Sequence, residues 1–213
     1  MRVLDLFAGT GSATQPFADA GHEVIKVELD ERFDADLHAD IMDVTGNQLL
    51  NLGSGGPYDF VWASPPCTAF SVASISTHWT GGRQAYIPKT RFAYESIKLV
   101  WHTLLLINLV TEPDNGHYVM ENPRGVLRKL APVQALDRST VWYCQYGDKR
   151  AKPTDLWHNL PTTWQALTCK NGNPDHEAAP RGAKTGTQGL AKHERSMVPY
   201  QLGQSILEAI SDD

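Results

Sequence analysis

The sequence predicts an α/β domain with a mostly parallel sheet, and three observations support this prediction. Short runs rich in β-branched and aromatic residues alternate with segments of helical periodicity. Several of these runs end at turns rich in glycine or proline, as strands do where the chain leaves a sheet. The chemically distinctive polar residues follow those ends, which is where ligands bind in open α/β sheets.

The elements follow in order along the chain. Six runs predict strands: 2–7 (RVLDLF), 22–30 (HEVIKVELD), 37–44 (LHADIMDV, with a turn), 58–64 (YDFVWAS), 116–123 (GHYVMENP) and 139–147 (STVWYCQYG). The first run enters a glycine turn, AGTGS, and then a helix-like segment up to Gly21. Residues 90–110 and 198–210 have the apolar periodicity of amphipathic helices. Residues 71–90, rich in Ser, Thr and Gly, predict a mobile loop.

The domain organisation follows from where the apolar content falls. Residues 151–195 are poor in apolar side chains and rich in turn formers, which indicates a loop-rich insert and not a second core. We therefore expect a main domain over 1–160, a short insert over 161–195, and a C-terminal segment, 196–213, whose helix packs back on the main domain.

Composition limits the class of protein. Formal net charge is −5, so the whole chain is not a polycation that coats nucleic acid, although a local basic face is compatible with it. Three widely spaced cysteines form no disulfide framework, which predicts a reducing, cytoplasmic location. Asp5 interrupts the opening apolar run, so we expect no signal peptide. The apolar run at 99–110 is too short to span a bilayer.

The glycine turn suits a nucleotide-type ligand held close to the backbone. Gly9 and Gly11 allow a tight turn and close approach. Glu28, at the end of the second predicted strand, is placed to accept hydrogen bonds from both ribose hydroxyls. The third glycine of a dinucleotide fingerprint is missing, so a purely structural turn or a dinucleotide site stays open.

Cys67 follows Pro65 and Pro66 at the end of the fourth predicted strand. A free cysteine is commonly a small buried hydrophobe. Here the prolines rigidify the approach and the neighbours are polar, so a thiolate stabilised at the strand end could act as a nucleophile. Glu121, where Pro123 ends the fifth strand, could be a desolvated carboxyl with a raised pKa that shares a proton with a ring nitrogen. The alternative is a surface glutamate that caps the next helix.

The remaining cysteines and the loop aromatics have simpler interpretations. Cys144 lies in an apolar run and is predicted to be core; Cys169, His176 and His193 suggest zinc, but no Cys-x-x-Cys pair exists. We therefore predict no metal. The aromatics Trp79, Tyr86, Phe92 and Trp101 are explained mainly by packing. Trp79 and Tyr86 could also contact a nucleic-acid strand together with the basic residues Arg83, Lys89 and Arg91.

Six motifs, in this order, resemble those of DNA cytosine-5 methyltransferases: DLFAGTGS, VELD, ADI, SPPCTAFS, ENPRG and VPYQLGQSI. The resemblance covers Val3 to about Ile210. It implies a Rossmann-like sheet and S-adenosyl-L-methionine as cofactor, with DNA as partner. The residues that it assigns to cofactor binding are Phe7, Ala8, Gly9, Thr10, Gly11, Glu28, Asp40, Ile41, Pro65, Gln204 and Ser205.

The resemblance also implies the chemistry. The Cys67 thiolate would attack carbon-6 of cytosine while Glu121 stabilises a proton at nitrogen-3, which makes carbon-5 nucleophilic toward the methyl group. A target in duplex DNA would be flipped out of the helix. Asn122 and Arg150 complete the implied catalytic set. Arg150 and Lys152, in YGDKRAKPT, stand where the family holds the flipped base with a Gln-x-Arg-x-Arg segment.

The chain departs from the family in size. Members usually carry a recognition domain of about 100 residues or more, whereas here only 161–195 is available, as in members of phage or prophage origin. A protein partner could then supply sequence specificity. Three alternatives stay open: a DNA amino-methyltransferase acting on adenine N6 or cytosine N4, the same chemistry on RNA or a free nucleotide, and a catalytically silent binding module.

Overall fold

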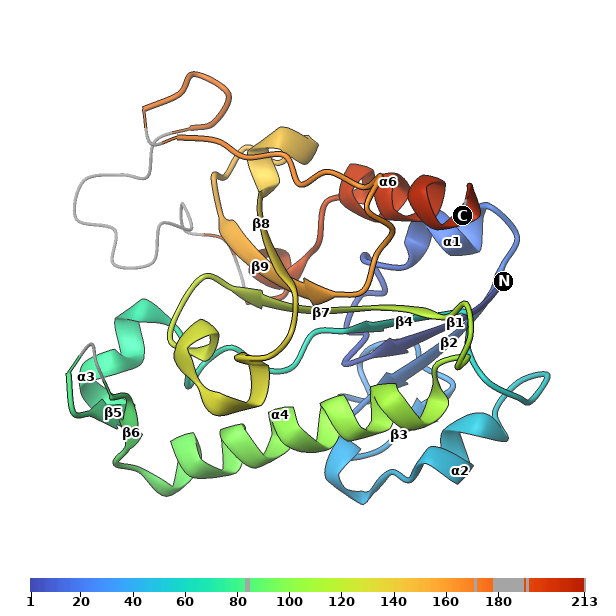
Figure 1. Ribbon diagram of the computed structural model, residues 1–213, viewed down its shortest axis with the longest axis horizontal. Coiled ribbons are helices and arrows are strands. Elements are labelled where there is room, and N and C mark those ends of the chain that lie inside the picture. The colour runs from blue at the N-terminus through green and yellow to red at the C-terminus, as the bar shows by residue number, and fades with distance from the viewer. Residues whose placement is uncertain (83–84, 171, 178–189, 191, 213) are drawn as a thin grey trace.

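The computed structural model describes residues 1–82, 85–170, 172–177, 190 and 192–212. Its main sheet has the strand order β3-β2-β1-β4-β7-β9-β8 (Figure 1). The strands are β1 Arg2–Leu6, β2 Glu23–Glu28, β3 Leu37–His38, β4 Phe60–Ala63, β7 His117–Pro123, β8 Arg138–Trp142 and β9 Pro153–His158. The first five pair in parallel, and β9 is antiparallel to both β7 and β8. The predicted mostly parallel α/β sheet is confirmed.

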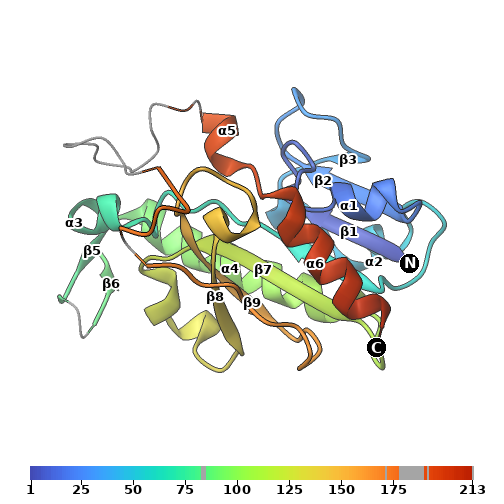
Figure 2. The same cartoon turned by 90° about the horizontal axis from the view of Figure 1, so that it is seen from above.

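Helices cover both faces of this sheet. Helix α4 (Arg91–Val110) and α2 (Gly46–Leu50) lie on one face, and α1 (Gln15–Asp19) and α6 (Tyr200–Ser211) lie on the other (Figures 1 and 2). Successive strand residues point to opposite faces. Val3 of β1 and Trp62 of β4 belong to the core between the sheet and α6. Their neighbours Leu4 and Val61 belong to the core between the sheet and α4.

The long helix forms where its apolar periodicity predicts it. The Thr90 side chain accepts a hydrogen bond from the Ala93 backbone N–H at 3.2 Å and caps the free N–H groups of the first turn. Buried positions then recur every three or four residues: Ala93, Ser96, Val100, Thr103, Leu106, Ile107 and Val110. The prediction of a helix over 90–110 is confirmed.

The C-terminal helix was expected to pack back on the main domain, and the structure places it against α1, near the start of the chain. A Cβ on Gly203 would lie 2.5 Å from the Ala13 carbonyl oxygen, so only glycine allows α6 to approach α1 this closely. The Val198 N–H donates to Ser12 Oγ at 3.0 Å. Residues nearly 190 positions apart in the chain therefore meet beside the glycine turn.

Several local predictions were wrong. Residues 143–146 form a 3₁₀ turn, η5 (Tyr143–Tyr146), because Gly147, with φ 87°, closes it in the left-handed region; the strand ends at Trp142. Strand β9 lies inside the segment that was expected to be loop-rich. The supposedly irregular 71–90 segment contains helix α3 (Ile75–His78) and the antiparallel pair β5 (Trp79–Thr80) and β6 (Ile87–Pro88).

The other short elements are connections. They are η1 Ile41–Asp43, η2 Val72–Ser74, η3 Leu127–Lys129, η4 Ala131–Val133 and α5 Lys192–Ser196. Within the residues that the structure describes, no helix is both long enough and apolar enough to cross a membrane. Much of the predicted insert, including 178–189, lies outside the described residues, and so does Arg83.

Candidate active site

The predicted site residues that follow β1, β2, β4 and β7 lie at one edge of the sheet, as predicted. Strands β1, β2, β4 and β7 are parallel, so their carboxyl ends share that edge. The chain order reverses between β1 and β4, where the connections on either side diverge and leave room for a ligand. The glycine turn, Glu28, the Cys67 loop and Glu121 all follow these strand ends.

The glycine turn is fixed by Glu28. Its Oε2 accepts a hydrogen bond from the Gly9 N–H at 2.8 Å, and its Oε1 accepts from the N–H groups of Leu29 and Asp30 at 2.9 and 3.0 Å. Phe7 has φ 63°, which is strained for a bulky side chain. Such strain concentrates where the backbone is shaped for a ligand.

These residues fit an adenosyl ligand. A Cβ on Gly9 would meet no atom within 4 Å, so the turn borders open space, and its φ of 52° suits glycine. Glu28 Oε2 accepts its hydrogen bond from Gly9 and keeps a lone pair for a ribose hydroxyl. Phe7, Ala8, Thr10 and Gly11 belong to the same turn. The Ala8 N–H donates to the Val27 carbonyl at 3.1 Å, which holds the turn against β2.

The predicted cofactor residues farther along the chain lie in different settings. Ile41 is buried and Asp40 is exposed, and Asp40 Oδ1 caps η1 by accepting from the Met42 N–H at 2.9 Å. The Ala39 N–H donates to the Glu28 carbonyl at 3.1 Å, so this segment lies beside the end of β2. An adenine-binding role for Asp40 and Ile41 stays a prediction.

Gln204 and Ser205 make contacts away from the glycine turn. Gln204 Nε2 donates to Glu208 within α6 at 2.9 Å, and Ser205 Oγ accepts from Trp164 Nε1 at 3.3 Å. Ser205 also borders a cavity of about 480 Å³ with Tyr146 and Trp164. Within this segment, Val198 contacts Ser12 of the glycine turn, and Gly203 lies against Ala13 and Pro16 just after it. Both residues lie in the VPYQLGQSI motif, but the sequence analysis named neither as a site residue.

Three contacts hold the Cys67 loop against the end of β7. Asn122 Nδ2 donates to the Pro65 carbonyl at 2.8 Å, and the Val126 N–H donates to the Phe70 carbonyl at 2.8 Å. A Cβ on Gly125 would lie 2.3 Å from that same Phe70 oxygen, so the close approach requires glycine. Both Pro65 and Asn122 therefore position the loop that carries Cys67.

Trp79 supports the loop from the other side. It is buried, and its Nε1 donates to the Ala69 carbonyl at 2.7 Å. The proposal that Trp79 stacks on a nucleic-acid base is therefore wrong, and the packing interpretation is correct for this residue. Cys67 itself is half-buried, and its carbonyl accepts from the N–H groups of Phe70 and Ser71 at 2.9 and 3.0 Å.

Glu121 is buried in β7 and faces three polar groups. The Tyr143 hydroxyl donates to its Oε1 at 3.1 Å. Burial raises the pKa of Glu121, while Lys152 and the hydroxyls of Tyr143 and Ser64 oppose the rise. The expected raised pKa is confirmed, and the surface-cap alternative is excluded by burial. Tyr143, which lay in the sixth predicted strand, was missed as a partner.

Burial raises the pKa of the Cys67 thiol, and the negative charge of Glu121 raises it further. Lys152 and Arg195 act in the opposite direction. The prediction of a thiolate stabilised by its strand end is therefore wrong for the protein alone. Cys67 and Glu121 are close enough for their charges to interact, so the structure brings the two predicted catalytic residues together.

Lys152 is the described cation with the largest influence on Cys67 and Glu121. Its Nζ lies 4.3 Å from the centre of the Tyr143 ring and donates to the Arg195 carbonyl at 3.0 Å. Burial lowers the pKa of Lys152, and the charges of Glu121 and Cys67 oppose this. Its φ of 26° is unusual for a residue other than glycine.

Arg150 has a different position. Its buried guanidinium forms an ion pair with Asp148, and Nη1 donates to the Glu194 carbonyl at 3.3 Å. Of the two basic residues that sequence reasoning named for base binding, Lys152 therefore lies beside the catalytic pair. Arg150 holds the preceding turn and the backbone of α5, and its predicted catalytic role stays untested.

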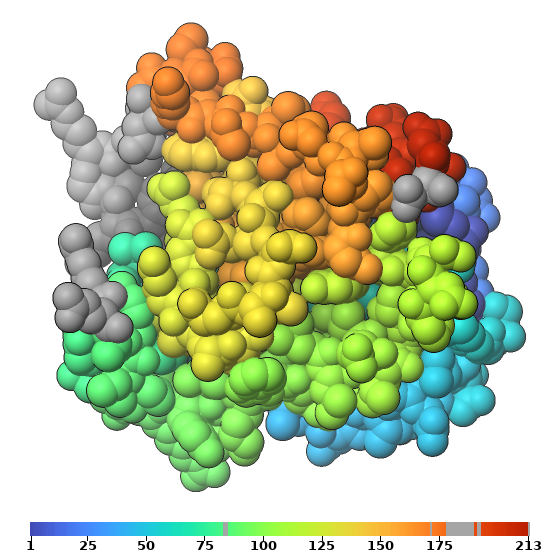
Figure 3. Space-filling view, in the orientation of Figure 1, coloured from blue at the N-terminus to red at the C-terminus, as the bar shows by residue number. Residues whose placement is uncertain are grey.

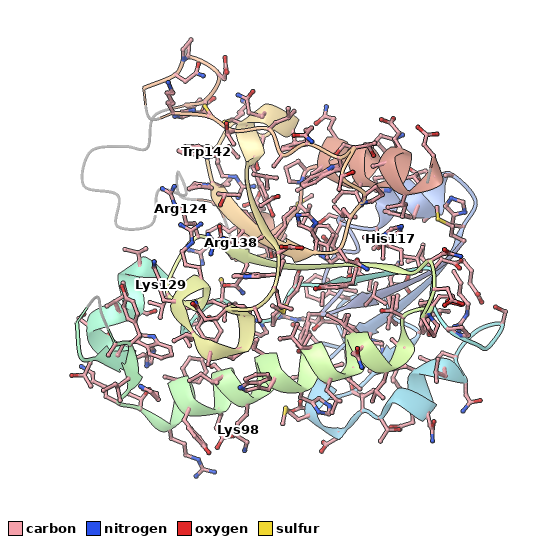
Figure 4. The ribbon with its side chains drawn as sticks, in the orientation of Figure 1. Lys98, His117, Arg124, Lys129, Arg138 and Trp142 are labelled. Carbon is pink, nitrogen blue, oxygen red and sulfur yellow. The ribbon has the colours of Figure 1, made fainter. Side chains whose placement is uncertain are left out.

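A basic surface adjoins the end of β7. Figure 4 labels Arg124, Lys129 and Arg138, which are exposed, together with Trp142. The Arg124 guanidinium lies 5.5 Å from the centre of a Trp142 ring, in cation–π range. Arg128 and Arg138 contact the buried Asp155 carboxylate, Arg128 Nη2 at 2.6 Å.

The chain is similar to known methyltransferases in sequence. Residues 1–128 match the family model of the C-5 cytosine-specific DNA methylases. A probable DNA (cytosine-5)-methyltransferase of Frog virus 3 (isolate Goorha) is 28% identical over 98% of this chain and 99% of its own length. That relative therefore shares the compact length of this chain.

A solved structure shows the same fold at low identity. The Entamoeba histolytica methyltransferase EhMeth superposes with a TM-score of 0.53 at 12% identity, over 80% of this chain and 57% of its own. The S. pombe Dnmt2 methyltransferase gives a TM-score of 0.49 at 14% identity, over 80% and 50%. This chain spans about half the length of these two proteins. The family match covers more than half of the chain, including Glu28, Cys67 and Glu121 and five of the six motifs, and together with the viral relative it confirms the resemblance. The chain belongs to the family of C-5 cytosine-specific DNA methylases.

Proposed function

We propose that the chain methylates carbon-5 of cytosine in DNA through a transient bond between the Cys67 sulfur and carbon-6 of the ring. The family uses S-adenosyl-L-methionine as cofactor, which supplies the methyl group as an electrophile. The observation that carries the proposal is the placement of Cys67 and Glu121 at adjacent strand ends, near enough for each charge to act on the other.

The cofactor would lie at the glycine turn. Glu28 is already oriented by three backbone N–H groups and would accept hydrogen bonds from the ribose hydroxyls. The space beside Gly9 would admit the ligand without a side-chain clash. We propose that Phe7, Gly11 and Pro65 border the same pocket, with Asp40 and Ile41 toward the adenine.

Cys67 is the nucleophile in this proposal. Its thiol has to lose a proton before it attacks, and the raised pKa means that the protein alone holds that proton. Lys152 stabilises the thiolate when it forms. Attack on carbon-6 breaks the aromatic ring and makes carbon-5 nucleophilic; loss of the carbon-5 proton after methyl transfer then expels the sulfur.

Glu121 assists at the opposite side of the ring. Because burial raises its pKa, the carboxyl can hold a proton and donate it to nitrogen-3 as negative charge develops there. The Tyr143 hydroxyl fixes the carboxyl orientation. Asn122 positions the Cys67 loop through Pro65 and does not itself need to touch the ring.

We propose DNA as the partner because the family acts on DNA and because a basic surface adjoins the site. Arg124, Lys129 and Arg138 would contact phosphates beside the site. A cytosine in duplex DNA would have to flip out to reach Cys67. We further propose a cytoplasmic location and that 161–195 is a reduced recognition region, so that a protein partner or a very short target sequence sets specificity.

The test is incubation with methyl-labelled S-adenosyl-L-methionine and cytosine-containing duplex DNA, followed by nucleoside analysis. We expect label on carbon-5 of deoxycytidine, and a covalent adduct with 5-fluorocytosine DNA. Cys67→Ser should abolish both, whereas Glu95→Gln, at an α4 glutamate that pairs with Lys98 outside this site, should retain adduct formation. Label on an exocyclic amine, or undiminished methylation by Cys67→Ser, would show that the amino-methyltransferase alternative is correct. In parallel incubations with RNA or free cytidine nucleotides, label on these and none on DNA would show that DNA is not the substrate.

A further inference from the structure

A second cluster of chemically capable side chains lies outside the methylation site. The ligand atoms of Cys144, Cys169 and His176 all lie within 4.8 Å of one another. Cys169 Sγ lies 3.6 Å from His176 Nδ1. Both cysteines are buried and carry free thiols, and His176 is half-buried. The mechanism proposed for methylation uses none of the three.

The cluster joins two parts of the chain. Cys144 lies in η5, while Cys169 and His176 belong to the segment that follows β9 and covers the upper part of the molecule in Figure 3 (orange). The Trp142 N–H donates to the Leu167 carbonyl at 3.1 Å. Gln145 Nε2 donates to Asp175 at 2.8 Å, next to His176.

Apolar packing is sparse at this junction, and the nearest large core reaches the segment earlier, at Trp164. The buried apolar group around the two sulfurs consists of Trp142, Cys144 and Cys169, with Ala151 packed against it. That group is far smaller than the two cores on the faces of the main sheet. The segment from Pro161 to Glu177 contains no described helix or strand. A bound metal ion adds its binding free energy to the folded state of the segments that carry its ligands.

We propose that Cys144, Cys169 and His176 bind one zinc ion that fastens the segment after β9 to η5. Zinc prefers thiolate and imidazole ligands in tetrahedral geometry, with bonds of about 2.3 Å to sulfur and about 2.0–2.1 Å to nitrogen. Those bonds place sulfur and nitrogen about 3.5 Å apart in a tetrahedron, close to the 3.6 Å between Cys169 and His176.

Binding has a simple chemical balance. Each thiol releases one proton to solvent as its sulfur bonds to the ion, so two thiolates neutralise the two positive charges. His176 coordinates as neutral imidazole through Nδ1, the atom that faces Cys169. A water molecule completes the four ligands. No change in oxidation state is involved.

Zinc content tests the site without reference to methylation. The full chain, purified with zinc in the medium and without chelator, should contain one zinc per chain by inductively coupled plasma mass spectrometry. After replacement by Co²⁺, the near-ultraviolet absorption should show thiolate-to-metal charge transfer. Cys169→Ser and His176→Ala should each lower zinc content at least tenfold, and His176→Ala alters a half-buried side chain, so its fold should be retained.

The matched control is Cys67→Ser, which removes the thiol outside the cluster and should leave one zinc per chain. Zinc-free wild-type protein in zinc medium would overturn the proposal, and so would a Cys144–Cys169 disulfide found by counting reactive thiols. Loss of zinc in Cys67→Ser with full retention in Cys169→Ser would also overturn it, because the metal would then lie elsewhere.

Discussion

Asp5 and Glu121 are both carboxyls buried in parallel strands of one sheet, and burial raises the pKa of each. Their surroundings differ. Asp5, in β1, accepts a hydrogen bond from the Thr14 hydroxyl at 2.7 Å, and its pKa rises to about 7. Glu121, in β7, lies in the field of Lys152 and beside the Cys67 thiol.

The difference shows that a raised carboxyl pKa does not by itself identify a catalytic acid. Asp5 is enclosed by the sheet and α1, with 1% of its surface exposed, and its partner Thr14 belongs to the turn that leads into α1. Glu121 shares its site with a nucleophile, a cation and a phenol. What separates the two is the presence of a reacting partner and not the strength of desolvation.

The comparison predicts the largest effect for Glu121→Gln. The amide cannot supply the proton at nitrogen-3, so the methylation rate should fall by about 10²–10⁴-fold, the usual contribution of a general acid. Glu95→Gln, at an exposed α4 glutamate that pairs with Lys98, should keep full activity. Single-turnover methylation of duplex DNA measures both. Near-normal turnover by Glu121→Gln would remove Glu121 from the mechanism.

Asp5→Asn should change stability instead, and in a pH-dependent way. The folded-state pKa of Asp5 is about 7 against an ordinary value of 3.8, so the folded chain binds the proton more tightly. The stability that this group contributes is complete below pH 3.8 and is lost as pH rises through about 7. The wild type should therefore weaken relative to Asp5→Asn by about 1.4 kcal/mol per pH unit in that window.

Urea denaturation of the wild type and Asp5→Asn between pH 4 and pH 9 measures the difference between their free energies of unfolding. This difference should widen to about 4 kcal/mol as an upper bound and become constant above neutral pH. Thr14→Val supplies a second check, because it removes the hydroxyl that stabilises the charged form and should raise the folded pKa further. A gap that does not vary with pH would show that Asp5 is not protonated in the folded chain.

Sequence reasoning located the parts of the site that depend on parallel strands. Strand ends that follow runs such as 58–64 and 116–123 meet at one edge, so the strand pattern alone places Cys67 and Glu121 together. The glycine turn and Glu28 followed from the same rule for β1 and β2. The long helix followed from its apolar periodicity, and the structure adds Thr90 as its cap.

The strand pattern of the sequence could not predict what β8 and β9 contribute to the site. Their antiparallel pairing places Lys152 and Tyr143 beside β7, and no local pattern in the sequence encodes that long-range pairing. Cys144 and Cys169 are 25 positions apart, so a search for closely spaced ligands passes over them. The direction of the Cys67 pKa depends on how burial outweighs a nearby cation, which only the three-dimensional arrangement decides.

Lys152→Met tests the smallest of these effects, the influence of one cation on the catalytic pair. Removing its charge should raise the pKa of Cys67, because Lys152 is the principal group that lowers it. Activity of the wild type should rise with pH as the thiol ionises, and in Lys152→Met that rise should move to higher pH. A shift of one pH unit reduces activity about tenfold at a fixed pH below the transition.

Lys149→Met is the matched control for this change. Lys149 pairs with Glu177 at 3.6 Å on the surface, with 82% of its side chain exposed, and it should leave the pH profile unmoved. Lys152→Arg should restore most of the lost activity by restoring the charge. All three variants are compared by the pH profile of their methylation rate. If Lys152→Met lost activity equally at every pH and its profile did not move along the pH axis, Lys152 would act by packing against Tyr143 and Arg195. The electrostatic explanation of the Cys67 site would then be wrong.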